Sequence, residues 1–170
     1  KQAYNTDIVL SDTMSAHIDE WEKMYSGKAP WTDSDEVISL RLEQAIVREF
    51  ANIALNEMNT SVSDERLNKV YQESLKNLNM NLQKGLALGA MVIKPVSAYT
   101  VQYVPQSSFI PIEYDINGKL MKVIFPEIKQ ISDFEYIIRL EYHSLDVING
   151  LTVTNRAFRS SSPDVLGKEI

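Results

Sequence analysis

The chain has 170 residues, of which 44% are hydrophobic and 24% are charged, and its formal net charge is −6. This composition is typical of a folded globular protein, and a chain of this length buries enough surface to fold without disulfides or metals. The sequence has no cysteine, which excludes disulfide bonds, thiolate metal ligands and cysteine nucleophiles. The longest apolar run is far shorter than the ~20 residues of a membrane-spanning helix, so no membrane partner is expected.

The negative charge is concentrated in the first half of the chain. Residues 1–90 carry nine Lys or Arg and fourteen Asp or Glu, whereas residues 91–170 carry eight and nine. Proteins that grip DNA by its phosphates present a basic face, and the sequence shows none. Any role with nucleic acid is therefore expected to be indirect.

The first half of the chain predicts three helices. The first begins at Ser11 or Asp12 and ends before Gly27 and Pro30, because a serine or aspartate caps a helix start and glycine or proline ends a helix. Its apolar residues at helical spacing are Met14, Ile18, Trp21 and Tyr25.

A second helix is predicted over residues 36–58, after Asp33 and Ser34 as candidate caps. Its apolar residues cover more than one face, which is typical of a helix buried between neighbours or in a subunit interface. They are Ile38, Leu42, Ile46, Phe50 and Ile53 on one side, and Leu40, Val47 and Leu55 elsewhere. A third helix is predicted over residues 64–88, with a single stripe of apolar residues, mostly leucines, and an end marked by Gly89.

The second half of the chain predicts an antiparallel sheet of about five to six strands, rich in β-branched and aromatic residues. Asn117–Gly118 and Asn149–Gly150 are typical hairpin turns between alternating runs. Helices followed by strands indicate the α+β class. We expect a single domain over residues 1–160, helical over 1–89 and sheet over 90–160, followed by a polar tail at 161–170.

The sequence offers no recognisable catalytic or metal site, and no cofactor is expected. The acidic cluster of Asp33, Asp35 and Glu36 lacks the EF-hand pattern and is interpreted as the acidic start of a helix. His17 and His143 are the only histidines, and neither has a partner at catalytic or ligand spacing. A surface or packing role is predicted for both.

Several segments, taken in order, resemble one protein family. They are WEKMYSGKAPW, ANIALNEM, GLALGAMVIKP, VQYVPQSSFIPIEYDINGKLMKVIF, YIIRLEYHSL, NGLTVTNRAFRS and LGKEI. Their order and spacing are similar to those of the N-terminal part of the portal proteins of tailed bacteriophages, in the siphovirus-type branch common in phages and prophages of Gram-positive bacteria. The resemblance covers nearly the whole chain.

The resemblance implies a structural subunit of the dodecameric ring at one capsid vertex, through which double-stranded DNA is packaged and ejected. The implied partners are further copies of the chain, the major capsid protein, the terminase and the head–tail adaptor. The implied location is the virion, and the host cytoplasm during assembly. The chain would correspond to the peripheral wing, with the stem and clip expected beyond Ile170. Independently of the resemblance, residues are expected upstream because the chain begins with Lys1 and not with methionine. Direct DNA contact is not expected, because the family's DNA-facing stem and tunnel loops come from later sequence.

Two alternatives remain open at this stage. The chain could be another phage head component, a minor capsid or connector-adaptor protein, that also acts by oligomeric assembly. It could also be a metal-dependent hydrolase or nuclease whose site is not recognisable, although the absence of paired histidines and of clustered carboxylates counts against an enzyme.

Both tryptophans flank the turn at Gly27 and Pro30. The favoured interpretation is a structural clasp, in which Trp21, Tyr25 and Trp31 pack across this corner and fix the angle between the first two helices. Burying a large aromatic side chain contributes on the order of 2–3 kcal/mol. The alternative places Trp31 in a subunit contact, where tryptophan is over-represented.

Leu40, Val47 and Leu55 are the candidate subunit interface. If they are exposed, they form an apolar patch of the kind that binds another protein. If the other helices and the sheet bury them, the chain has no such patch in the second helix.

Overall fold

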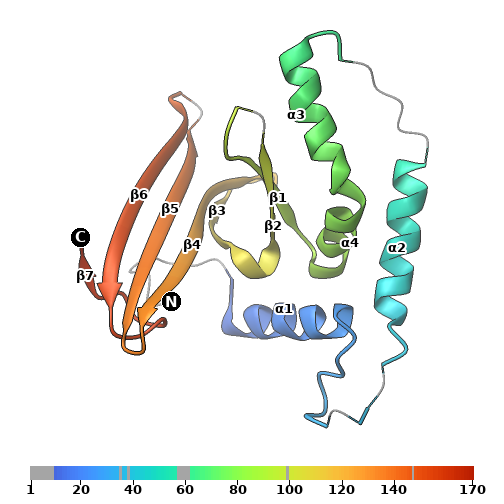
Figure 1. The fold of residues 1–170 in the computed structure, drawn as a ribbon, viewed down its shortest axis with the longest axis horizontal. Coiled ribbons are helices and arrows are strands. Elements are labelled where there is room, and N and C mark those ends of the chain that lie inside the picture. The colour runs from blue at the N-terminus through green and yellow to red at the C-terminus, as the bar shows by residue number, and fades with distance from the viewer. Residues whose placement is uncertain (1–9, 35, 38, 57–61, 99, 147) are drawn as a thin grey trace. The chain divides into compact units, whose positions relative to one another are not determined.

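The computed structural model describes residues 10–34, 36–37, 39–56, 62–98, 100–146 and 148–170, and its fold is α+β (Figure 1). In these residues four helices precede two antiparallel sheets, which confirms the predicted class and order. The helices are α1 (Asp12–Tyr25), α2 (Leu42–Leu55), α3 (Glu65–Lys76) and α4 (Leu78–Leu88). The strands are β1 (Met91–Pro95), β2 (Val101–Pro105), β3 (Ile110–Tyr114), β4 (Leu120–Ser132), β5 (Glu135–Asp146), β6 (Gly150–Ser160) and β7 (Lys168–Glu169).

The chain divides into two compact units. The helical unit is Thr13–Ser107, and the sheet unit combines Lys1–Asp12 with Ser108–Ile170. The change from helix to strand falls near residue 90, as predicted, but the hairpin of β1 and β2 belongs to the helical unit because both strands contact α4. The hydroxyl of Tyr103 in β2 also donates a hydrogen bond to the carbonyl of Ser74 in α3. That residues 1–160 act as a single domain stays a prediction.

Helix α1 ends in a glycine cap. Gly27 has a φ of 86°, and its N–H donates to the Met24 carbonyl at 3.0 Å. The N–H of Lys28 donates to the Lys23 carbonyl at 2.9 Å. These two bonds form a Schellman motif, whose left-handed position favours glycine. Gly27 therefore ends the first helix, as the sequence predicts.

Helix α2 begins later than predicted. A start near residue 36 was expected from Asp33 and Ser34, but the helix begins at Leu42. Arg41 has a φ of 52° and a ψ of 38°, in the left-handed region, so the right-handed helix cannot extend back through it. Ser34 instead closes a turn, in which its hydroxyl accepts a hydrogen bond from the N–H of Glu36 at 3.3 Å.

Two helices replace the single helix predicted over residues 64–88. Asp64 caps α3 by accepting a hydrogen bond from the N–H of Leu67 at 2.8 Å. The break lies at Asn77, which has a φ of −114° and a ψ of 8°. This backbone conformation is not that of an α-helix, so the apolar stripe does not continue as one helix. The predicted end of the second helix at Met58 lies outside the described residues.

Strands β3 to β7 form a five-stranded antiparallel sheet in sequence order (Figure 1). Register places Ile138 opposite both Ile128 and Phe158, so these three side chains share one face of the sheet. The core of the sheet unit is the buried cluster of Ile124, Ile138, Leu140 and Phe158, with Ile110, Ile112, Tyr142 and Leu166 packed against it. This cluster holds the sheet unit together through contacts between its own residues.

The turn between β3 and β4 contains the predicted Asn117–Gly118 pair. Asp115 organises it, because its Oδ1 atom accepts hydrogen bonds from the N–H of Asn117 at 2.9 Å and of Lys119 at 2.8 Å. Gly118 has a φ of 77°, a conformation that other residues adopt only with strain.

The turn between β5 and β6 contains the second pair, Asn149–Gly150, and has a similar construction. The Oδ1 atom of Asp146 accepts hydrogen bonds from the N–H of Ile148 at 2.7 Å and of Asn149 at 2.8 Å. These bonds lower the pKa of the Asp146 carboxyl, because they stabilise its charged form. Gly150 has a φ of 71°.

The predicted polar tail at 161–170 ends in a strand. Lys168 and Glu169 pair with Arg159 and Phe158 of β6 as strand β7. The next N–H, that of Ile170, donates to the carbonyl of Ala157 at 2.9 Å. The tail therefore adds a short strand to the edge of the sheet, which the polar composition did not predict.

Candidate subunit interface on helix α2

One face of α2 packs on α4 (Figure 1). Ala51 is completely buried on this face, and its small side chain permits a close approach of the two helices. Val47 and Leu55, one turn before and one turn after it, are half-buried. The amide of Asn79 in α4 donates a hydrogen bond to the side-chain oxygen of Asn52 at 3.0 Å. These contacts position α2 within the helical unit.

A second face of α2 is apolar and exposed to solvent. Leu42, Ile46, Phe50 and Ile53 recur at intervals of four, four and three residues, which places them on one side of the helix. Each of them is between 56% and 68% exposed. We call these four residues the α2 outer face. Ile38, which belonged to the predicted stripe, lies outside the described residues.

The α2 outer face is unusual in energetic terms. Fully burying one large aliphatic or aromatic side chain stabilises a protein by roughly 1.5–3 kcal/mol. Covering the exposed part of these four would therefore contribute on the order of 4–7 kcal/mol before the costs of association are subtracted. A contiguous patch of this kind marks an interaction surface more often than an ordinary monomer surface.

A shallow groove adjoins the α2 outer face. It has a volume of about 280 Å³ and lies between helices α1, α2 and α4. Its lining residues are Trp21, Met24, Tyr25, Glu43, Ile46, Val47, Leu86 and Ala87. Ile46 belongs both to the groove and to the α2 outer face, so the two form one continuous apolar surface.

The clasp predicted across the turn at Gly27 and Pro30 is not supported by the exposure of its second tryptophan. Trp31 is 76% exposed, so its indole cannot supply the burial energy that the interpretation requires. Trp21 stacks on His17, with ring centroids 6.3 Å apart and an angle of 16° between the rings. The alternative, in which Trp31 takes part in a subunit contact, stays a prediction.

The side chain that lies over the helix end is that of Arg41. A Cβ atom built on Gly27 would lie 2.5 Å from the Arg41 Nε atom. The turn therefore returns the chain so that the Arg41 side chain lies against the glycine. Pro30 is half-buried within the turn.

The three residues proposed as a subunit interface fall in different environments. Leu40 is 82% exposed and fits the proposal, whereas Val47 and Leu55 are half-buried on the α4 side of the helix. The prediction missed Ile46 and Phe50, because apolar residues on several faces do not reveal which face a neighbouring helix covers. The small residue Ala51 was the available signal, since close helix contacts favour small side chains.

Another polar cluster of the described residues lies on β5. His143 and Glu141 lie 2.5 Å apart (Nε2 to Oε1) on β5, and the imidazole meets the Phe125 ring edge-on with centroids 5.1 Å apart. No group of three or more potential metal ligands occurs among the described residues. Asp35, from the predicted acidic cluster, lies outside them.

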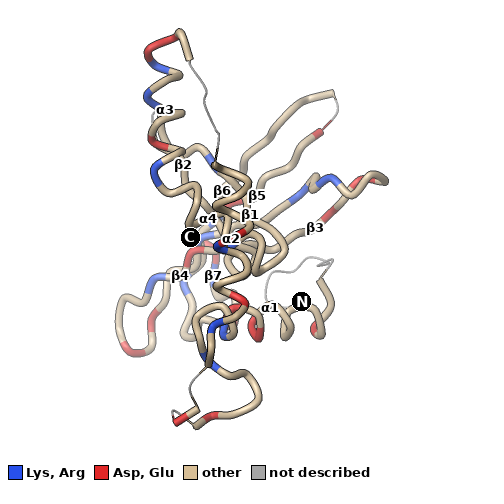
Figure 2. The backbone as a smooth tube through the Cα atoms, turned by 90° about the vertical axis from the view of Figure 1, so that its right-hand side faces the viewer, with Lys and Arg blue, Asp and Glu red and all other residues tan. Residues whose placement is uncertain are grey.

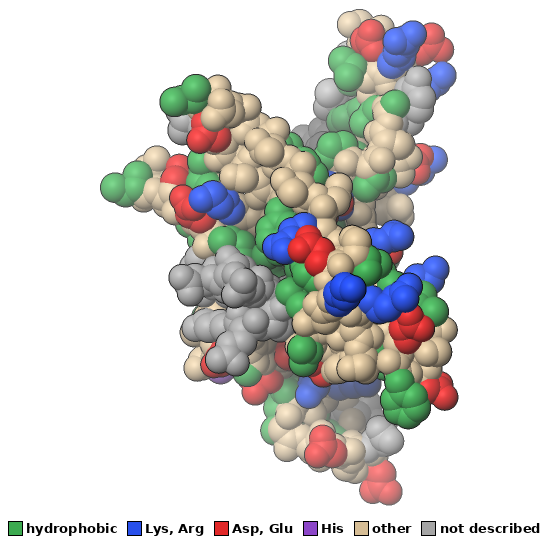
Figure 3. Space-filling model, turned by 90° about the vertical axis from the view of Figure 1, so that its left-hand side faces the viewer, with side chains coloured by type: hydrophobic (Ala, Val, Ile, Leu, Met, Phe, Trp, Pro, Cys, Tyr) green, Lys and Arg blue, Asp and Glu red, His purple; other side chains and the backbone are tan. Residues whose placement is uncertain are grey.

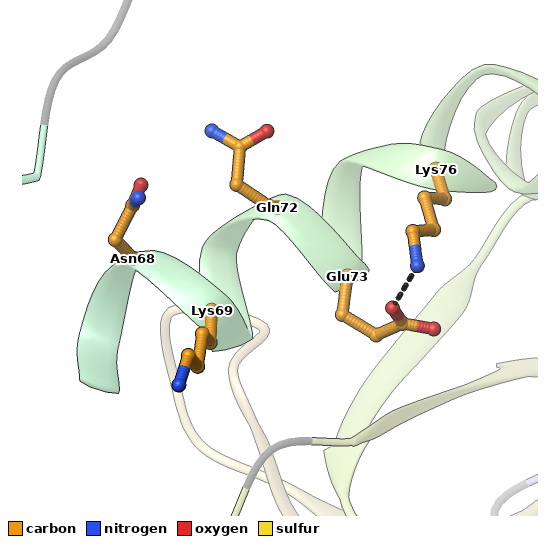
Figure 4. Close-up of a pocket in the computed structure, with 5 residues that line it drawn as sticks. All are labelled: Asn68, Lys69, Gln72, Glu73 and Lys76. Atoms are coloured by element: carbon orange, nitrogen blue, oxygen red, sulfur yellow. Dashed lines mark hydrogen bonds and ion pairs between the residues drawn. The ribbon is translucent and has the colours of Figure 1, made fainter. Parts of the chain in front are cut away.

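A hollow of about 320 Å³ lies along α3. Its residues are Asn68, Lys69, Gln72, Glu73 and Lys76, all from one helix (Figure 4). The only contact drawn between them is the ion pair of Glu73 and Lys76, at 2.5 Å. Basic and acidic residues are interspersed along α3 (Figure 2), so the hollow has no charge of one sign that would select a ligand.

Among the described residues, no helix combines the length and the apolar character that crossing a bilayer demands. Comparisons of the chain with protein-family models, with curated proteins and with solved structures gave no match.

Proposed function

We propose that this chain is a structural subunit that works by assembling with further copies of itself, and that the assembly is the portal ring of a tailed bacteriophage. The observation that carries the first part is the α2 outer face, four large apolar side chains that are each more than half exposed. The second part rests on the resemblance of the ordered sequence segments to portal proteins.

The α2 outer face suits a ring for a geometric reason. A closed ring is built from head-to-tail contacts, in which one surface of a subunit meets a different surface of the next. A stripe on one exposed helix, continuous with a groove between three helices, offers an extended apolar surface for one side of such a contact. The exposed Trp31 adds an aromatic side chain of the kind enriched at interface hot spots.

The remaining parts of the proposal follow from the portal resemblance. The ring would be a dodecamer at one capsid vertex, in contact with the major capsid protein, the terminase and the head–tail adaptor. Double-stranded DNA would pass through the ring without contact with this segment, in keeping with the excess of acidic residues in its first half.

The test is the particle mass and shape of three proteins. We would measure the wild-type chain, Phe50→Asp and Phe134→Asp by light scattering at increasing concentration and by negative-stain electron microscopy. Phe50 is 62% exposed on the α2 outer face, and Phe134 is 83% exposed in the sheet unit. Phe134→Asp is therefore a matched control for the effect of placing a new charge at an exposed phenylalanine.

We expect the wild type and Phe134→Asp to exceed the monomer mass of 19.4 kDa and to form ring-shaped particles, and Phe50→Asp to remain a monomer. A wild type that stays monomeric at every concentration would contradict assembly through this surface. Particles of defined mass without a central opening would favour another head component over the portal.

A further inference from the structure

The groove between α1, α2 and α4 contains a half-buried carboxylate that has no cationic partner. Of the eight residues that line the groove, Glu43 is the only charged one. It is half-buried, and none of the ion pairs that the described part of the chain forms includes it. A charge that is partly removed from water is costly to leave unpaired. The groove therefore suits a partner that brings a cation.

The rest of the groove suits an aliphatic side chain. Trp21, Ile46 and Leu86 line it and are 38%, 56% and 48% exposed. An aliphatic side chain that entered the groove would remove part of their surface from water, which is favourable. Because the groove is concave, this side chain has to project from the surface of the partner. The partner surface is thus an apolar projection with a cation beside it.

The tight turns of the sheet unit carry apolar side chains that project into solvent. Ile116, between β3 and β4, is 99% exposed, Phe134, between β4 and β5, is 83% exposed, and Ile148, between β5 and β6, is 90% exposed. The turns of the two isoleucines lie at the same end of the sheet, because its antiparallel strands follow one another in sequence order. Figure 3 shows two projections that each end in hydrophobic side chains, with a basic side chain next to one of them.

Only one of these three turns carries a basic residue. Lys119 lies three residues after Ile116 and is exposed, and it belongs to none of the ion pairs of the described residues. The charged residues of the other two turns are acidic, namely Asp133 and Glu135 beside Phe134, and Asp146 beside Ile148. An acidic turn is repelled by Glu43, whereas a basic one is attracted. Charge complementarity therefore selects the turn at residues 115–119, which we call the Ile116 turn.

The backbone of the Ile116 turn is fixed by its own hydrogen bonds. The Asp115 N–H donates to the Lys119 carbonyl at 2.9 Å, and the Gly118 N–H donates to the Asp115 carbonyl at 3.0 Å. The Lys119 N–H in turn donates to the Asp115 carboxylate at 2.8 Å. A turn that is already ordered loses little conformational entropy when it binds. Ile116 and Lys119 are thus presented from a fixed frame.

We propose that the Ile116 turn of one copy docks in the groove of the next copy, with Ile116 among the apolar lining residues and the Lys119 ammonium beside the Glu43 carboxylate. One surface of the chain then meets a different surface of its neighbour, which is the head-to-tail contact that a ring requires. The inference rests on the proposed function, because it supplies the second side of the contact whose first side is the groove and the α2 outer face.

Exchanging the two charges tests the ion pair. Lys119→Glu and Glu43→Lys each place like charges in the contact, so each should raise the protein concentration of half-assembly, measured by light scattering, about ten-fold or more. The double variant restores opposite charges and should return this concentration to within a few-fold of the wild-type value. A double variant that assembles no better than the single variants would overturn the pairing.

Two isoleucine variants test the apolar part of the contact. Ile116→Ser removes the side chain that enters the groove and should raise the concentration of half-assembly about ten-fold or more. Ile148→Ser is the matched control, because it removes the same side chain from a similarly exposed turn, and it should assemble as the wild type does. Equal effects of the two substitutions would overturn the choice of the Ile116 turn.

Single cysteines show whether the turn and the groove that meet belong to different copies. The chain contains no cysteine, so when Ile116→Cys and Ala87→Cys proteins are mixed, a short thiol cross-linker can join these two positions only between two chains. We expect a cross-linked heterodimer, because Ala87 lines the groove, and no heterodimer when Ile148→Cys replaces Ile116→Cys. Absence of the first product, or equal yields from the two mixtures, would overturn the proposal.

The same experiments separate this inference from the proposed function. If the wild type assembles, and Phe50→Asp prevents assembly while Ile116→Ser and Lys119→Glu do not, the second side of the contact lies elsewhere and only the inference fails. A wild type that stays monomeric at every concentration would contradict both.

Discussion

The core of the sheet unit and the outer face of α2 differ in the exposure of their large apolar side chains. In the sheet unit, Ile124, Ile138 and Leu140 are at most 2% exposed and pack in one cluster. In the helical unit, Phe50 and Ile53 of α2 are more than 60% exposed. The sheet unit therefore closes its core with its own residues, whereas α2 keeps an apolar face that a further surface can cover. The first arrangement supplies stability, and the second is the surface through which we propose that the chain assembles.

The largest effect is expected in the sheet core. Leu140→Ala should lower the free energy of unfolding by about 2–5 kcal/mol, because it leaves a cavity at a fully buried site. Urea denaturation of dilute protein measures the change. Leu67→Ala, at a leucine of α3 that is 62% exposed, is the control and should change stability by less than about 0.5 kcal/mol. Equal losses of unfolding free energy in the two variants would contradict the prediction that buried apolar residues stabilise the chain more than exposed ones.

The next effect concerns the attachment of β7. A Cβ atom added at Gly167 would lie 2.0 Å from the Arg159 carbonyl oxygen, so Gly167→Ala should displace β7 and cost about 1–3 kcal/mol, as other overpacking does. Hydrogen exchange at the Ile170 amide should accelerate. In Gly118→Ala the new methyl group meets open space, and the positive φ alone should cost about 1–2 kcal/mol. The Ile170 amide should stay protected from exchange in the Gly118→Ala control. Fast exchange of this amide in the control would show that the exchange rate does not report on the attachment of β7.

Acid should weaken the same attachment, because the attachment includes an ion pair between Arg156 of β6 and Glu169 of β7. Arg156 lowers the pKa of Glu169 from its usual value of 4.5, so the pair contributes fully above that value, and its contribution is lost as the pH falls through the lowered pKa. The chemical shift of the Ile170 amide should therefore change as the pH is taken below 4.5. In Arg156→Ala this pH-dependent change of the chemical shift should be absent. If the change is retained in the variant, it arises from the titration of another carboxyl group.

The smallest effect is expected at Trp31. Because this side chain is 76% exposed, Trp31→Ala should change the stability of dilute protein by less than about 0.5 kcal/mol. The clasp interpretation requires a loss of roughly 3–5 kcal/mol, so thermal denaturation of the variant distinguishes the two. A large loss would restore the clasp.

The sheet was the part of the fold most readily predicted from the sequence. Alternating residues and the pairs at Asn117–Gly118 and Asn149–Gly150 indicate strands and turns directly, because both signals are local. The start of α2 could not be predicted in this way, since it depends on the left-handed conformation of Arg41. The break at Asn77 is likewise hidden beneath a continuous apolar stripe.

The candidate site was predicted only in part. The broadly apolar second helix was recognised, but the exposed face proved to be that of Ile46 and Phe50 rather than that of Val47 and Leu55. Periodicity places residues on faces of a helix, but the face that is buried is decided by the position of α4.

The central claim is that the α2 outer face is covered by another copy of the chain. Hydroxyl-radical footprinting tests it directly by comparing oxidation of Phe50 with that of Phe134, an exposed phenylalanine of the sheet unit. We predict that oxidation of Phe50 falls as the protein concentration rises, while oxidation of Phe134 stays constant. Oxidation of Phe50 that is independent of concentration, in a range where light scattering shows assembly, would contradict the claim.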